Sequence, residues 1–69
     1  MNQREREETV RYGMECGLTA KQTWHTVLET ARHMRDKGVP VAAVQQHRDS
    51  WSLAIQRVYG IQDARLFKH

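Results

Sequence analysis

Cysteine and long apolar runs are scarce in this sequence. Its 69 residues include one cysteine, Cys16, so no disulfide can form within the chain. Such a chain is typical of a reducing compartment. No apolar run approaches the length needed to cross a membrane, and the charged residues 1–8 are not followed by the apolar segment of a secretory signal. We therefore expect a soluble, cytoplasmic protein with no membrane partner.

The motifs of enzymes are missing as well. The sequence has no glycine-rich phosphate loop and no nucleophile elbow between a strand and a helix. Cys16 falls at the end of an expected helix, where the helix dipole does not activate a thiol. A chain this short also leaves little room for a closed pocket. We expect a non-enzymatic protein that needs no cofactor and has no small-molecule substrate.

Three residues have a spacing that could form a metal site. His25, Glu29 and His33 follow one another at intervals of four residues, a spacing at which adjacent side chains on a helix can chelate a divalent ion. Such residues are also common on a solvated helix face, and no closely spaced Cys and His residues support a metal. We interpret the three residues as part of a polar surface.

What remains is a pattern of helices. Apolar residues recur with the helical period, and nothing alternates with period two for long enough to predict a strand. Three glycines follow the helical stretches and end them, which predicts helices over residues 4–16, 20–37 and 40–59. Thr19 and Gln22 fit a capping box, and Pro40 suits the first helical position. Residues 63–67 allow one further helical turn, and we expect residues 1–8 to be solvated or frayed.

The expected fold is all-α, a single domain of three helices joined by very short turns, which favour packed neighbouring helices. The apolar stripes predict a shared core of Trp24, Met34, Val44, Trp51, Ile55 and Val58. His47 and Arg48 interrupt the third stripe, which places them at the edge of this core. Because a domain of this size has a marginal core and no disulfide, we expect it to form a homodimer.

The function that the sequence favours is DNA binding. The stretch Gly13-x-x-x-Gly17-Leu18-Thr19 resembles the turn of a helix-turn-helix, in which a small residue lets two helices cross closely. The resemblance covers about a third of the chain and implies a recognition helix that begins after Thr19. Its DNA-contacting residues would be Lys21, Gln22, His25 and Arg32. The sequence departs from the pattern at Thr23 and Thr26, where such helices bury aliphatic side chains. A net charge of +3 is compatible with a small DNA-binding regulator.

The alternative is a helical adaptor or inhibitor that docks on a larger protein, as do many accessory proteins of phages and plasmids. Leu53 and Tyr12 lie off the apolar stripes of their helices, and an apolar side chain off the core face can mark an interface. Arg57 is one helical turn from Leu53 and adds a charged anchor. The basic residues also gather in the later two-thirds of the chain: Arg32, Arg35, Lys37, Arg48, Arg57, Arg65 and Lys68. This distribution is compatible with one basic end that binds phosphates and equally with a mixed, soluble surface.

Overall fold

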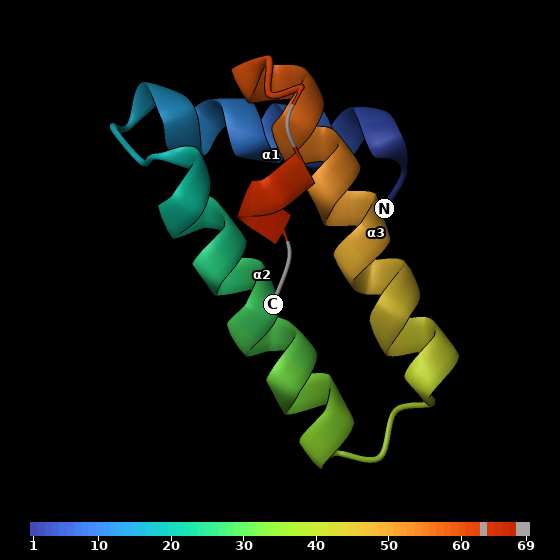
Figure 1. Cartoon of the computed structure of the whole chain (residues 1–69). Helices are drawn as coiled ribbons and strands as arrows, with labels where there is room; N and C mark the ends of the chain where they lie inside the picture. The colour runs from blue at the N-terminus through green and yellow to red at the C-terminus, as the bar shows by residue number, and fades with distance from the viewer. Residues whose placement is uncertain (63, 68–69) are drawn as a thin grey trace.

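The computed structural model describes residues 1–62 and 64–67 and shows a small all-helical domain, as expected. Three α-helices follow in order, α1 (Gln3–Glu15), α2 (Ala20–Asp36) and α3 (Val41–Tyr59), and a short 3₁₀ helix, η1 (Ala64–Phe67), comes last (Figure 1). No strand occurs among the described residues. Of the helical turn expected at residues 63–67, position 63 lies outside the described residues and the rest forms η1.

Residues 1–8, expected to be solvated or frayed, contain the beginning of α1. The side chain of Asn2 caps the helix by accepting a hydrogen bond from the backbone N–H of Glu5 at 2.9 Å. Glu5 also places a negative charge in the first turn, at the positive end of the helix dipole. Arg6 and Glu7 on this segment are half-buried, so one side of it packs against the bundle while the other faces solvent.

The turn between α1 and α2 has the local chemistry that the sequence predicts. Gly17 has a φ of +94°, a left-handed conformation that glycine adopts without strain. Thr19 then caps α2, and the capping box with Gln22 is confirmed in both directions. The threonine hydroxyl accepts from the Gln22 N–H at 3.1 Å, and the Gln22 side-chain oxygen accepts from the Thr19 N–H at 2.8 Å.

Helix α3 begins one residue later than expected. Pro40 was predicted as the first helical residue, but its ψ of 142° is extended, so it is the N-cap and Val41 is the first helical residue. The Pro40 carbonyl accepts hydrogen bonds from the N–H groups of Ala43 and Val44, which starts the helical hydrogen-bond ladder. A proline is tolerated here because this position needs no N–H donor. The helix ends at Gly60, whose φ of 69° is left-handed.

The core is built from all three α-helices. Its fully or almost fully buried side chains are Val10, Trp24, Val27, Ala31, Val44, Ala54 and Ile55. Of the predicted core, Trp24, Val44 and Ile55 are buried, whereas Trp51 and Val58 are half-buried and pack against the cluster. Met34 is half-buried and is not part of that cluster. It lies near the α2–α3 turn, away from the region where α1 and η1 cover the other two helices (Figure 1).

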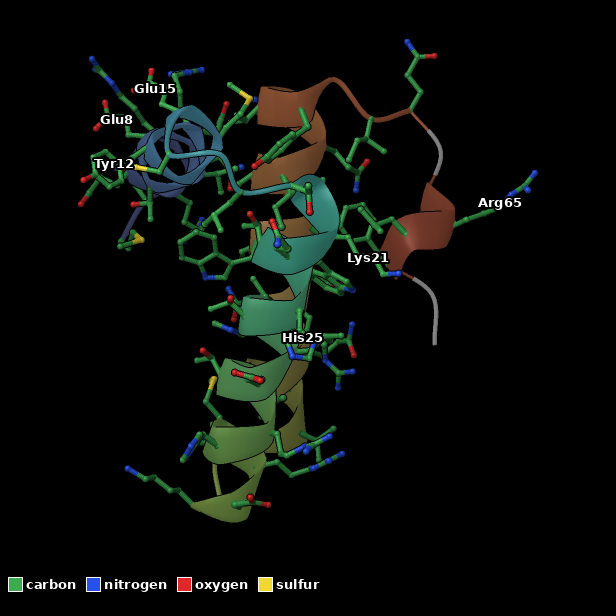
Figure 2. The ribbon with its side chains drawn as sticks, turned by 90° about the vertical axis from the view of Figure 1, so that its left-hand side faces the viewer. Glu8, Tyr12, Glu15, Lys21, His25 and Arg65 are labelled. Carbon is green, nitrogen blue, oxygen red and sulfur yellow. The ribbon has the colours of Figure 1, made fainter. Side chains whose placement is uncertain are left out.

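Helices α2 and α3 form an antiparallel hairpin, and its two sides are covered differently. Figures 1 and 2 show α1 lying across one side of the hairpin and η1 on the opposite side. The η1 contact includes a perpendicular ring packing of Phe67 on Trp24, with centroids 4.7 Å apart. The half of the hairpin nearest the α2–α3 turn is covered by neither segment (Figure 1). Two surfaces of α2 and α3 are therefore left for contacts outside the fold.

Candidate binding surfaces

The four residues predicted to contact DNA all lie exposed on α2. Two of them have their side chains engaged in the fold. The Gln22 oxygen is held in the capping box, and His25 Nε2 lies 3.0 Å from a carboxylate oxygen of Glu29. Lys21 and Arg32 have no ion-pair partner among the described residues.

The resemblance to a helix-turn-helix implies that Gly13 lets two helices cross closely. A Cβ atom added there would lie 3.2 Å from Leu18 Cδ1, so the closest neighbour of Gly13 is a side chain of the turn and not of α2. The two departures also have a structural counterpart. Thr23 and Thr26, at positions where a recognition helix buries aliphatic residues, line an open pocket instead.

A second surface of α2, next to the predicted one, gathers three arginines. A groove of about 380 Å³ runs between α2 and α3 and is lined by Leu28, Ala31, Arg32, Arg35, Val44 and Arg48, which we call the arginine groove. Ala31 and Val44 are buried and Leu28 is half-buried, so the floor is apolar. Arg32 and Arg35 are exposed along its α2 edge. None of the residues that line it is acidic.

The positions of His47 and Arg48 agree with the core edge where the sequence placed them. Both are half-buried, but these adjacent residues lie on different sides of the hairpin. Arg48 lines the arginine groove and, with Phe67, a smaller depression beside η1. His47 lies on the α1 side, with its ring centroid 6.4 Å from that of Trp51.

On that α1 side the molecule has a pocket of about 300 Å³, which we call the threonine pocket. Helix α1, the turn after it, α2 and α3 all contribute to its wall, which consists of Thr9, Val10, Gly13, Leu18, Thr23, Thr26, Val27, Thr30, His47 and Trp51. The sequence did not predict this pocket, because Thr23 and Thr26 stood out there only as departures from the helix-turn-helix pattern. A regular row of threonines at positions 23, 26 and 30 is the signal that marks this side of α2.

The residues predicted for a protein interface lie on two helices, α1 and α3. Leu53 is 42% exposed on α3 and Tyr12 is 70% exposed on α1. Arg57 contacts Glu7 of α1, with 3.8 Å between Nη1 and Oε2, and this pair helps to join α1 to α3. Arg57 shares a shallow depression with residues of the first turns of α1, and Tyr12 is not among them.

Charge is distributed unevenly over the two sides of the hairpin. Figure 2 shows Glu8, Tyr12 and Glu15 on α1 at one side of the molecule, while Arg65 projects from η1 at the other and Lys21 reaches in the direction of η1. The arginine groove opens near the η1 side, because Arg48 lines both the groove and the depression beside Phe67. On this side the exposed cations that edge the groove are Arg32 and Arg35 of α2, while Asp49 adds a carboxylate to the depression beside Phe67.

Within residues 1–62 and 64–67, no three His, Cys, Asp or Glu side chains come together as metal ligands, and Cys16 is an exposed free thiol. No helix in the described part of the chain is long and apolar enough to span a membrane. No family model, curated protein or solved structure matches the chain.

Proposed function

We propose that this chain is a non-enzymatic, helical protein-binding module, an adaptor or inhibitor, and that the arginine groove is its docking surface. The observation that carries the proposal is the arrangement of Arg32, Arg35 and Arg48 around an apolar floor. Arginine is enriched at protein interfaces because its planar guanidinium group binds carboxylates through two parallel hydrogen bonds. An apolar floor adds an area that a partner's side chain can cover.

The chemistry of the groove specifies the partner. A segment that fits it has an apolar side chain to cover Leu28 and Val44, and carboxylates to meet the exposed Arg32 and Arg35 along the α2 edge. An amphipathic helix with acidic residues next to its apolar stripe has this arrangement. The net charge of +3 favours its approach over long distances, more strongly at low salt.

DNA binding is the second candidate, and the exposed Lys21 and Arg32 favour it. They lie on the same flank of α2, eleven residues or about three helical turns apart, so both can face one phosphate backbone. Reading of bases would require Gln22 and His25 to leave their present partners. We therefore expect any DNA binding to depend on phosphate contacts and to fall steeply with salt.

A direct test is fluorescence anisotropy with two labelled probes, a short acidic helical peptide with a leucine stripe and a mixed-sequence DNA duplex. The critical variant is Arg35→Glu, and its matched control is Lys37→Glu. Both positions are exposed at the end of α2, and both substitutions change the net charge equally, but Lys37 does not line the groove. If Arg35 is an interface anchor, Arg35→Glu costs about 2 kcal/mol, or roughly thirtyfold in Kd, while Lys37→Glu changes binding little.

The outcomes separate the two candidates. Equal losses in the two variants would show that only net charge matters, and the groove would not be the docking surface. Binding of the duplex but not of the peptide, with a salt dependence that Lys21→Ala reduces, would replace the protein-binding proposal by DNA binding. Sedimentation of the same samples tests the expected homodimer.

A further inference from the structure

The threonine pocket lies on the side of the hairpin opposite the arginine groove and differs from it in chemistry. No Asp, Glu, Lys or Arg side chain lines it. Val10 and Val27 form a buried part of its wall, and Leu18 and Trp51 contribute further apolar surface. His47 is the only lining side chain that can become charged at neutral pH, and its Nε2 atom is buried, so an ionised ligand gains little here to offset the water that it loses.

The hydroxyl groups of the pocket determine which polar group a ligand can carry. Thr23, Thr26 and Thr30 each donate to a backbone carbonyl one helical turn earlier on α2, over 3.0, 3.3 and 3.1 Å. Thr9 does the same on α1 at 2.9 Å. A hydroxyl that has already used its proton still has lone pairs and can accept a hydrogen bond. The threonines therefore favour a ligand with an N–H or O–H donor over one that brings only acceptors.

The volume limits the size of the ligand. A closed apolar cavity of roughly 150 Å³ holds one benzene molecule. The threonine pocket has about 300 Å³ and is formed between three helices, so it has room for a ligand of about two fused rings. Pockets at the lower end of the range seen for small ligands have this volume.

From these observations we propose that the threonine pocket binds a small, uncharged, mainly apolar molecule with a single hydrogen-bond donor. This ligand is bound and not converted, so the proposal goes beyond the expectation that the protein has no small-molecule substrate. It does not depend on the arginine groove, since the two sites share no residue. Indole has the required chemistry, with two fused rings, one N–H donor and no charge, and serves as the probe.

The experiment is isothermal titration calorimetry of the full chain with indole and with indole-3-acetate, which has the same ring system and a carboxylate. We expect indole to bind, and indole-3-acetate to bind at least about tenfold more weakly because no Lys or Arg side chain lines the pocket to meet its carboxylate. Thr26→Phe places a ring at the exposed edge of the pocket and should abolish indole binding. The matched control, His33→Phe, adds a ring at another exposed position of α2 that does not line the pocket.

Far-UV circular dichroism establishes that both variants remain folded, which is expected because both positions are exposed. Three results would each overturn the proposal. The first is no heat of binding up to the solubility limit of indole. The second is equal binding of indole-3-acetate. The third is unchanged indole binding in Thr26→Phe, which would place the ligand elsewhere.

Discussion

Replacing Ile55 by alanine tests the packing of the whole domain. Ile55 is 0% exposed and packs in one cluster with Val10 of α1, Trp24 and Val27 of α2 and its neighbour Ala54. Because side chains of all three helices surround Ile55, they can move little to fill the cavity that a shorter side chain would leave. The cost should lie in the upper half of the usual range of about 2–5 kcal/mol for such a substitution, near 4 kcal/mol. A chain of this length has a total stability of about 3–10 kcal/mol, so the variant should be close to unfolding.

The matched control is Leu53→Ala, which removes a side chain of the same volume from the same helix. Leu53 is 42% exposed, so we expect a loss of about 1 kcal/mol. Urea unfolding followed by circular dichroism measures both, and with a slope of about 1 kcal/mol per molar the midpoints should fall by roughly 4 M and 1 M. Where the wild-type midpoint is itself below about 4 M, the Ile55 variant should have lost its helical signal before urea is added.

Equal shifts in the two variants would refute the assignment of Ile55 to the core. The same assay can also reveal self-association. A large loss in Leu53→Ala, together with a wild-type midpoint that rises with protein concentration, would place Leu53 in the interface of the expected homodimer. The two explanations are thus distinguished by repeating the unfolding at two protein concentrations.

Three smaller perturbations test the turns. Thr19→Ala removes the capping box and should lower the free energy of unfolding by about 1 kcal/mol in the same urea assay, and an unchanged midpoint would mean that the cap contributes nothing. Gly17→Ala meets no atom within 4 Å but forces a side chain into a φ of +94°, so calorimetry should show a loss of about 1–2 kcal/mol; a gain would contradict the left-handed turn. Tyr59→Phe deletes the hydroxyl that donates to the Leu18 carbonyl at 2.6 Å and should cost about 0.5–1.5 kcal/mol, whereas the exposed Tyr12→Phe should be neutral.

The sequence determined the helices and their ends. The periods of the apolar stripes, the glycines after each helix and the capping box at Thr19 are local features, since each depends on residues within about one turn of one another. The sequence predicts Pro40 as the first helical residue, whereas it is the N-cap. The fixed φ of proline suits both positions, and only its ψ distinguishes them. Three of the six predicted core residues are buried, Trp24, Val44 and Ile55, because the burial of a side chain depends on which other segment covers its helix face.

Only the tertiary structure decided which faces meet and which remain open. Arg32 and Arg48 were visible in the sequence as separate basic residues, but their groove exists because α3 returns alongside α2. Thr23 and Thr26 became a pocket wall only when α1 crossed one side of the hairpin while η1 took the other (Figures 1 and 2). The physical reason is that hydrogen bonding and capping within a helix act between near neighbours in the chain, whereas grooves and pockets arise from packing between segments far apart in it.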